Sequence, residues 1–399
     1  MQRTSSTASE ISSPDRVVIL LVAAAHTAAA LGSWQQLNIF SLVSAFMGLA
    51  IVVSAPTVWR NREAITRDKL LWLLVAFVVL AMWSLIRSDD PARFGISTRI
   101  VGYLFTYVAI TNVVRKKSQV QIIFAAIALG AVIQAMIVIG DFFTAKDIGK
   151  YLRPTGSFEN PNAAAYPMML GLIVAAVALL ARRGRPRALV AFALAVGLIA
   201  VAIALTLSKA AILGLGAAFF VYMSVPGRTP MRFKVAGATV AIGITLAVLL
   251  GTLTFTKNNA AQDAWYTVTD RLDSIPYGFK YWAQEPIFGT GFDEFRRLRT
   301  AEKGVKSGGI HNVPFNVLVE MGLITFVLYI AVMGTIIAQS ARAIGNSNSP
   351  SSRAMFVLIL AMLISQHAFG QTHQNLVTGS FWMTNAIAVA AFRNIVRES

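Results

Sequence analysis

Charged residues are scarce in this chain, and cysteine is absent from it. The absence of cysteine excludes disulfides, a thiol nucleophile and cysteine-ligated metals. Only 13% of the 399 residues are charged, whereas about a quarter are in a typical soluble domain. The sequence also lacks the alternating pattern of an outer-membrane barrel and the small-residue cleavage site of a signal peptide. These absences leave a helical membrane protein as the expected class.

Long apolar runs predict about 12 transmembrane helices, because backbone polar groups in lipid must be bonded within their own segment. The runs lie at residues 17–34, 37–55, 70–86, 99–114, 120–141, 161–181, 188–206, 208–225, 235–255, 313–339, 354–371 and 379–395. The runs at 188–206 and 208–225 are so close that they could form one interrupted element. The predicted fold is therefore all-α and polytopic, with one long, partly helical polar segment at 256–312.

The net charge of +17 is distributed unevenly between the two ends of the predicted helices. One set of loops carries most of it, at Arg60, Arg62, Arg67, Lys69, Arg115, Lys116, Lys117, Arg182, Arg183, Arg185, Arg187, Arg228, Arg232, Lys234, Arg342 and Arg353. The positive-inside rule places these loops and both termini in the cytoplasm. Because the charge follows topology, we do not expect nucleic-acid binding.

This topology predicts five parts in the chain. A cytoplasmic tail (1–16) precedes nine helices (17–255), and a long outward catalytic segment (256–312) follows them. Three more helices (313–395) and a short cytoplasmic tail (396–399) complete the order.

The outward loops also carry cations, although the topology rule predicts few there. They are Arg87, Arg93, Arg99, Lys146, Lys150, Arg153, Lys209, Lys257, Arg271, Lys280, Arg296, Arg297, Arg299, Lys303 and Lys306. Arginine and lysine gathered at a membrane face suit a phosphate or diphosphate. For any single residue, a solvated or snorkelling charge is the alternative. For the whole set, we favour an anionic ligand.

Two short stretches combine cations with turn and cap residues. Residues 153–162 read Arg-Pro-Thr-Gly-Ser-Phe-Glu-Asn-Pro-Asn, and Asn160 or Asn162 is predicted to cap the helix that follows. The exposed N–H groups of such a helix start also suit an anion. The second stretch is Ser208-Lys209, where a lysine between apolar runs either contacts a ligand or reaches the interface.

The long polar segment contains two predicted helices and a turn. Residues 263–273 form a polar helix with Arg271 near its end, and residues 293–302 form a short, charged one. Gly289 and Gly291 indicate a tight turn between them. Because no strand precedes these glycines and no Lys-Ser/Thr pair follows, they do not indicate a nucleotide-binding loop.

The chain has four histidines, His26, His311, His367 and His373, and their spacings make no zinc motif. We therefore expect neither a metal nor another cofactor. His311, followed by Asn312, lies where the polar segment meets the next apolar run. Neighbouring cations would keep its imidazole neutral, so that it can accept a proton from a hydroxyl. The alternative is a helix-start histidine bound to a backbone carbonyl.

The order of these features resembles one family. The residues that carry the resemblance are the loop from Arg153 to Asn162, Ser208-Lys209, Arg271, Trp282, Gly289-x-Gly291, Phe295, His311-Asn312, Leu318, Glu320, Gly322 and Leu323. In this order they resemble the O-antigen ligase and polymerase superfamily of bacterial inner-membrane enzymes. That superfamily also includes oligosaccharyltransferases that glycosylate pilins.

The resemblance implies a glycosyltransferase that takes a glycan from undecaprenyl diphosphate at the periplasmic face. In the ligase branch, which we favour, the acceptor is a sugar of the lipid A-core oligosaccharide. His311 matches the essential histidine of the family, and Arg271 matches its loop arginine. Lys209 stands where the family usually has arginine, which keeps the charge and loses the forked contact.

We therefore expect His311 to act as general base, and Arg271, Lys209 and Arg153 to hold the diphosphate. Further candidates for diphosphate binding are Arg93 and Arg99. Expected supporting residues are Asn312, Ser208, Asn160, Asn162, Glu320, Gly289 and Gly291. A single in-line displacement would invert the anomeric configuration.

Three alternatives remain open from the sequence. The first is an O-antigen or exopolysaccharide polymerase that uses the same donor, and the second is a protein O-oligosaccharyltransferase. The third, more distant one is a lipid or solute transporter. Transporters usually show internal repeats and ionisable residues at the membrane midplane, and this sequence has few of either.

Overall fold

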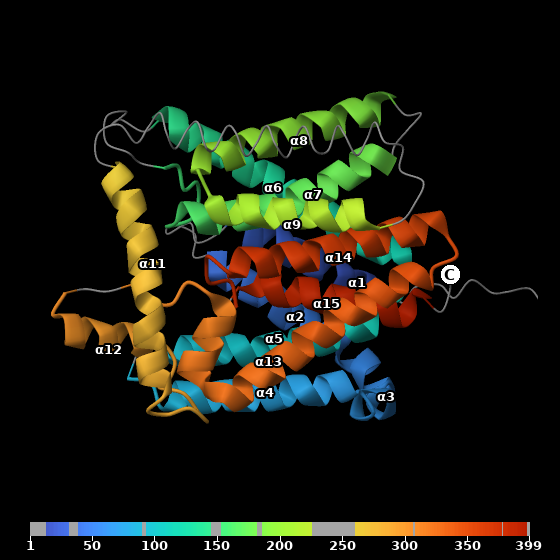
Figure 1. Cartoon of the computed structure of the whole chain (residues 1–399). Helices are drawn as coiled ribbons and strands as arrows, with labels where there is room; N and C mark the ends of the chain where they lie inside the picture. Colours follow the sequence, from blue (N-terminus) through green and yellow to red (C-terminus); the bar gives the residue numbers. More distant parts are fainter. Residues whose placement is uncertain are drawn as a thin grey trace, which may run out of the picture.

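The computed structural model describes residues 13–31, 39–89, 93–144, 153–181, 186–225, 260–305, 308–376 and 378–396. This part of the chain contains helices and no strand, which confirms the all-α class (Figure 1). The helices are α1 (Ser13–Ala30), α2 (Ile39–Arg60), α3 (Arg62–Thr66), α4 (Lys69–Ile86), α5 (Arg93–Val113), α6 (Lys117–Thr144), α7 (Pro161–Ala181), α8 (Pro186–Thr206), α9 (Lys209–Ser224), α11 (Ala260–Trp282), α12 (Glu294–Lys303), α13 (Val313–Gly345), α14 (Pro350–Gly370) and α15 (Gly379–Asn394).

Every predicted apolar run within the described residues overlaps one of these helices, whereas the run at 235–255 lies outside them. Seven of the described helices are long and apolar enough to cross a membrane: α2, α4, α6, α7, α8, α13 and α14. Helix α9 is apolar but has only 16 residues. A polytopic membrane protein is thus supported, and the predicted number of about 12 spans is not confirmed.

Helices α8 and α9 are two separate elements. The chain turns between them at Leu207, whose φ of 51° lies in the left-handed region that a leucine rarely adopts. Helix α8 packs against α6 and α7, whereas α9 packs against α14 and α7. Because the two helices have different main partners, the interpretation of one interrupted element is wrong.

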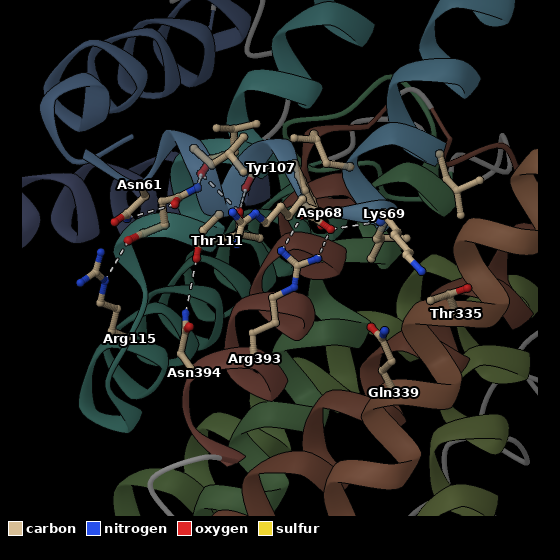
Figure 2. Close-up of a pocket in the computed structure, with 18 residues that line it drawn as sticks. Asn61, Asp68, Lys69, Tyr107, Thr111, Arg115, Thr335, Gln339, Arg393 and Asn394 are labelled. Carbon is tan, nitrogen blue, oxygen red and sulfur yellow. Dashed lines mark hydrogen bonds and ion pairs between the residues drawn. The ribbon is translucent and has the colours of Figure 1, made fainter. Parts of the chain in front are cut away.

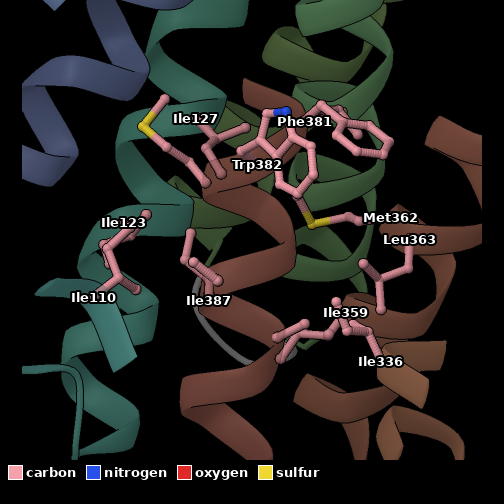
Figure 3. Close-up of a cluster of buried hydrophobic side chains, with 14 of the residues drawn as sticks. Ile110, Ile123, Ile127, Ile336, Ile359, Met362, Leu363, Phe381, Trp382 and Ile387 are labelled. Atoms are coloured by element: carbon pink, nitrogen blue, oxygen red, sulfur yellow. The ribbon is translucent and has the colours of Figure 1, made fainter. Parts of the chain in front are cut away.

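Helix α15 lies in the core of the bundle. Residues 380–391 are all buried, which is expected of a helix that is apolar on every side. Its neighbours include α5, α13 and α14. Figure 3 shows Trp382 and Ile387 of α15 in one apolar cluster with Met362 of α14 and Ile110 of α5.

Glycines permit close approach of neighbouring helices, a common way to pack helices in membranes. A Cβ added to Gly130 of α6 would lie 2.8 Å from the Cβ of Ala30 and 3.2 Å from the carbonyl oxygen of Thr27, both in α1. A Cβ added to Gly214 of α9 would lie 2.9 Å from the carbonyl oxygen of Ser365 in α14.

Helix α11 lies across one end of the bundle, at a steep angle to the long helices (Figure 1). The predicted polar helix 263–273 is longer than expected and continues through Pro276 to Trp282. Arg271 is therefore in the middle of α11, and its expected position near the end of the helix is wrong. Helix α12 confirms the predicted short, charged helix within one residue at each end.

We predict that Gly130→Ala lowers the free energy of unfolding by about 1–3 kcal/mol, because the added methyl group overpacks the contact between α1 and α6. Thermal unfolding in one detergent measures this effect. The matched control is Gly140→Ala in the same helix, where an added Cβ meets no atom within 4 Å. The control is expected to be neutral or stabilising by up to about 1 kcal/mol, since alanine favours helix. Equal losses in both variants would contradict the proposed packing.

Candidate active site

The turn between α11 and α12 packs against a break in α13. Gly289 and Gly291 have φ of 71° and 105°, conformations that favour glycine. Gly322 of α13 has φ 83° and ψ 174°, so the helical hydrogen-bond pattern is interrupted there. The predicted tight turn is therefore confirmed, and its partner is a kink in the following membrane helix.

Backbone hydrogen bonds join this turn to the kink in both directions. Thr290 N donates to Val319 O at 3.0 Å, and Gly291 N donates to Glu320 O at 3.0 Å. In the opposite direction, Leu323 N donates to Pro286 O at 2.9 Å. The kink exposes carbonyl and N–H groups that a regular helix would satisfy internally, and the turn satisfies them instead.

The turn and the kink of α13 approach each other so closely that Gly289 and Gly322 must be glycines. A Cβ on Gly289 would lie 2.5 Å from Gly322 N and 2.6 Å from Glu320 O. A Cβ on Gly322 would lie 2.6 Å from Gly289 N. A Cβ atom is not tolerated within 3.0 Å of a backbone atom, so neither position accepts a side chain in this geometry.

Glu320 is buried, with 2% of its surface exposed, and its Oε2 accepts a hydrogen bond from Asp293 N at 3.0 Å. Asp293 itself has φ 59°. Glu320 therefore holds the start of α12 in place through this hydrogen bond.

Arg87, at the end of α4, is an outward cation whose guanidinium is bound by other groups of the protein. Its Nη1 donates to Gly289 O at 2.9 Å, and its Nη2 forms an ion pair with Glu285. Ser84 adds two contacts from the same helix, donating to Glu320 O at 2.8 Å and accepting from Phe292 N at 3.2 Å. Arg87 thus fixes the turn to α4.

Arg299 of α12 is a second cation with a structural role. Its side chain is completely buried, and Nη2 lies 2.8 Å from Asp270 Oδ1 of α11. Its guanidinium also lies 5.6 Å from the ring centre of Tyr277. Arg299 therefore clamps α12 onto α11 directly beside Arg271.

Three helices begin at this end of the bundle, each with a polar cap. Asn160 Oδ1 accepts from Asn162 N at 2.8 Å at the start of α7, as predicted. Ser208 caps α9, and Asn312 caps α13 by accepting from Phe315 N at 2.9 Å. The N-terminal ends of these helices carry partial positive charge and favour an anion nearby.

Arg153 binds the end of α8. Its Nε donates to Thr206 O at 2.7 Å, and its Nη2 donates to Leu207 O at 3.2 Å and to Asn162 Oδ1 at 3.3 Å. Ser208 Oγ donates to the same Asn162 oxygen at 2.8 Å. Two of the three guanidinium nitrogens of Arg153 thus hold the strained turn at Leu207, and Nη1 has no hydrogen-bond partner among the described residues.

Arg271 carries a charge that the described part of the protein does not bind. It is half-buried, and its Nε is buried without a hydrogen-bond partner there. Burial lowers its pKa and the neighbouring Asp270 carboxylate raises it. Burial and the charge of Arg271 together lower the pKa of Arg153 to about 10, so the two guanidinium groups lie close to each other.

His311 is half-buried, and its ring makes no hydrogen bond to the residues that the structure describes. Burial lowers its pKa first and the charge of Arg271 lowers it further, whereas Asp270 raises it. The imidazole is therefore neutral near pH 7. A Cβ added to Gly308 would lie 2.8 Å from Asp270 Oδ2 and 3.8 Å from His311 Nε2, so the two side chains flank this glycine.

His373 is a site residue that our sequence analysis did not select. Its ring is nearly parallel to that of His311, with centres 6.5 Å apart. Burial lowers its pKa to about 4, assisted by the charges of His311, Arg271 and Arg153. The available signal was its position in the outward loop after the run at 354–371.

The loop that carries His373 is bonded to the segment that carries His311. Gln374 Nε2 donates to Ile310 O at 2.7 Å, and Asn312 Nδ2 donates to Gln371 Oε1 at 2.8 Å. These bonds on either side of His311 fix the relative position of the two rings.

The remaining predicted cations are placed differently. Lys209 is the exposed first residue of α9, directly after the turn that Arg153 holds, and it forms no ion pair within the described residues. Arg99 lies on α5, where its charge acts on Tyr103. The side chain of Arg93 lies outside the described part of the structure. No group of three or more potential metal ligands occurs among the described residues.

The fold and this site define a polytopic helical membrane protein with cations and two histidines gathered at one end of its helices. Residues 194–330 match the sequence model of the family described as O-antigen ligase. The match contains Lys209, Arg271, His311 and Glu320, but not Arg153 or His373. No curated protein matches the chain. The predicted resemblance to the O-antigen ligase superfamily is confirmed over these 137 of the 399 residues.

We predict that Gly322→Ala lowers the free energy of unfolding by about 2–4 kcal/mol, because the backbone is strained for alanine and the Cβ collides with the turn. Limited proteolysis between α11 and α12, together with thermal unfolding, measures the loss. Gly334→Ala is the matched control in the same helix, since a Cβ there meets no atom within 4 Å. Unchanged proteolysis in Gly322→Ala would show that the turn does not depend on the kink.

Proposed function

We propose that this protein is an O-antigen ligase that transfers a glycan from undecaprenyl diphosphate to a hydroxyl of the lipid A-core oligosaccharide. The observation that carries the proposal is the position of His311. Its ring is unbonded among the described residues and lies beside Arg271, within the segment that matches the O-antigen ligase family. In this arrangement, His311 can accept a proton and the neighbouring Arg271 can bind a phosphate.

In the proposed reaction, His311 accepts the proton of the acceptor hydroxyl. The hydroxyl oxygen then attacks the anomeric carbon of the glycan, and the bond from that carbon to the diphosphate oxygen breaks. The diphosphate leaves with the electron pair of that bond. The lowered pKa of His311 supports this role, because only the neutral imidazole can act as a base.

Arg271, Arg153 and Lys209 are proposed to bind the departing diphosphate. The guanidinium of Arg271 and Nη1 of Arg153 have no protein acceptor among the described residues, and Lys209 is exposed directly after the turn that Arg153 holds. Preorganised cations stabilise charge that develops in the transition state. Because diphosphate is a good leaving group and these cations neutralise it, we propose a metal-independent reaction.

The attack is proposed to be a single displacement that inverts the anomeric configuration. No carboxylate takes part as a nucleophile in this scheme, since Asp270 is bonded to Arg299 and Glu320 to Asp293 N. His373 is proposed to position His311 through the stacked rings and to exclude water on that side.

The site is proposed to face the periplasm, with the protein in the bacterial inner membrane and both termini in the cytoplasm. The loops at the opposite end of the helices carry the larger number of lysine and arginine residues, which supports this orientation.

We predict that His311→Ala reduces glycan transfer by about 100- to 10,000-fold, because general-base catalysis contributes on that order. The assay uses purified protein, an undecaprenyl-diphosphate-linked oligosaccharide and lipid A-core, with a chelator present. Product is measured by a mass shift of the core lipid, and thermal unfolding confirms that the variant is folded.

Each outcome of this assay is informative. Full activity in folded His311→Ala would contradict the base assignment, and loss of activity with chelator would contradict metal independence. Longer lipid-linked chains in place of modified core lipid would identify a polymerase. A mass shift on an added pilin would identify a protein transferase.

Two substitutions of Arg271 separate its charge from its forked geometry. Arg271→Gln removes a charge that lowers the pKa of His311, so that pKa rises. The acidic limb of the kcat profile, measured from about pH 5 to 8, is then expected to shift to higher pH. Arg271→Lys keeps the charge, so its limb should remain in place while KM for the donor increases. Equal shifts in both variants would contradict an electrostatic effect of Arg271 on His311.

A further inference from the structure

A cavity of about 930 Å³ lies at the end of the bundle opposite His311. Figure 2 shows the residues that line it. Its walls come from the start of α4, the end of α5, the second half of α13 and the end of α15. Along α13, Thr335 in this cavity is 22 residues beyond Val313, which corresponds to roughly 33 Å of helix. This is close to the thickness of a membrane, so the cavity belongs to the other membrane face.

An ion pair fixes one wall of the cavity. Arg393 of α15 donates from Nη1 and Nη2 to the two carboxylate oxygens of Asp68, at 2.6 and 2.5 Å (Figure 2). The same carboxylate accepts from Tyr107 Oη at 3.3 Å and from Leu70 N at 3.0 Å. The single negative charge in the lining is therefore satisfied by the protein.

The other ionised groups of the lining are all cations: Arg67, Lys69 and Arg115. Among the described residues, the side chains of Arg67 and Lys69 form no hydrogen bond or ion pair. Arg115 uses only Nε, which donates to Asn112 O at 3.1 Å. Three cations without counter-ions around one cavity favour an anion, and phosphate is the group that such side chains bind best.

The cavity also has apolar and hydrogen-bonding surface. Leu70, Leu71 and Leu73 of α4 contribute to its lining. Gln339 of α13 lies in the lining as well, and its Oε1 is buried with no hydrogen-bond partner in the described part of the chain. A buried amide oxygen of this kind requires a donor. The matching ligand therefore combines a phosphate, a hydroxyl and an apolar portion.

Exposed tryptophans place the cavity at the depth of lipid head groups. Trp72, between the lining residues Leu71 and Leu73, is 56% exposed, and Trp59 at the same end is 70% exposed. Trp72 Nε1 donates to Thr66 O at 2.8 Å, so its polar edge faces the loop. Exposed tryptophan is typical of the membrane–water interface.

We propose that this cavity binds a phosphate-bearing amphiphile, namely the head group of an anionic phospholipid that carries a free hydroxyl. The phosphate lies at Lys69, on the same side of the Asp68–Arg393 pair as Gln339 (Figure 2). The hydroxyl donates to Gln339 Oε1, and the glycerol and upper acyl chains contact the leucines of α4. Arg67 and Arg115 add positive charge elsewhere in the lining. This site is independent of the proposed transfer reaction at the other end.

Native mass spectrometry of the full-length, delipidated protein tests the proposal, with phosphatidylglycerol and phosphatidylcholine of equal chain length as probes. The wild type should bind its first phosphatidylglycerol more tightly than phosphatidylcholine. The triple variant Arg67→Gln, Lys69→Gln, Arg115→Gln should weaken that binding by about tenfold or more, because the charged hydrogen bonds are lost. Lys69→Gln alone tests the same contact if the triple variant unfolds.

The matched control removes three cations at the same end but outside the cavity lining: Arg60→Gln, Arg62→Gln, Arg342→Gln. It should change the affinity by no more than about twofold, since distant charges attract the lipid only through a screened field. Equal losses in both triple variants, or no preference of the wild type for phosphatidylglycerol, would overturn the proposal.

Two further binding measurements identify the chemical class of the ligand. Gln339→Leu should weaken phosphatidylglycerol and leave phosphatidic acid unchanged, because only the former has head-group hydroxyls. An excess of glycerol 3-phosphate should fail to displace the lipid. Displacement would assign the phosphate site to a soluble phosphate ester and overturn the lipid assignment.

Discussion

The site depends on the backbone pairing between the turn at residues 286–293 and the kink of α13 at Gly322. A membrane helix that loses its internal hydrogen bonds must find other partners, and here the turn supplies them. This contact anchors the polar segment between the two main residues of the proposed site, with Arg271 before it in the chain and His311 after it. The buried Arg299 then fixes α12 against α11, which lies across one end of the bundle (Figure 1).

Electrostatics divides the outward cations into two groups. Arg87 and Arg299 are bound to carboxylates and carbonyl groups, so their charges are satisfied within the fold. Arg271 and part of Arg153 have no such partner among the described residues. Burial lowers the pKa of both, and the charge of Arg271 lowers that of Arg153 further. Such an arrangement is unfavourable while the site is empty and becomes favourable when an anion binds. Burial and the charge of Arg271 also keep His311 and His373 neutral, which in the proposed reaction keeps a base available beside the phosphate.

The two ends of the bundle use cations differently. At the His311 end, the charges come from segments far apart in the sequence, with Arg153 before α7, Arg271 in α11 and His311 before α13. At the opposite end, the charges follow from the loops that the positive-inside rule predicts, and only three of them line a cavity.

The sequence by itself determined the helical class, the positions of the apolar runs, the glycine turn and the short helix α12, because these depend on local composition and spacing. It also selected His311 and Arg271, since a polar segment in an apolar chain contains few candidates. Only the tertiary structure decided that Arg299 is buried and Arg271 is not bonded, because identical side chains differ only in their neighbours. It likewise placed His373 beside His311, 62 positions apart in the chain, through hydrogen bonds that no sequence spacing reveals.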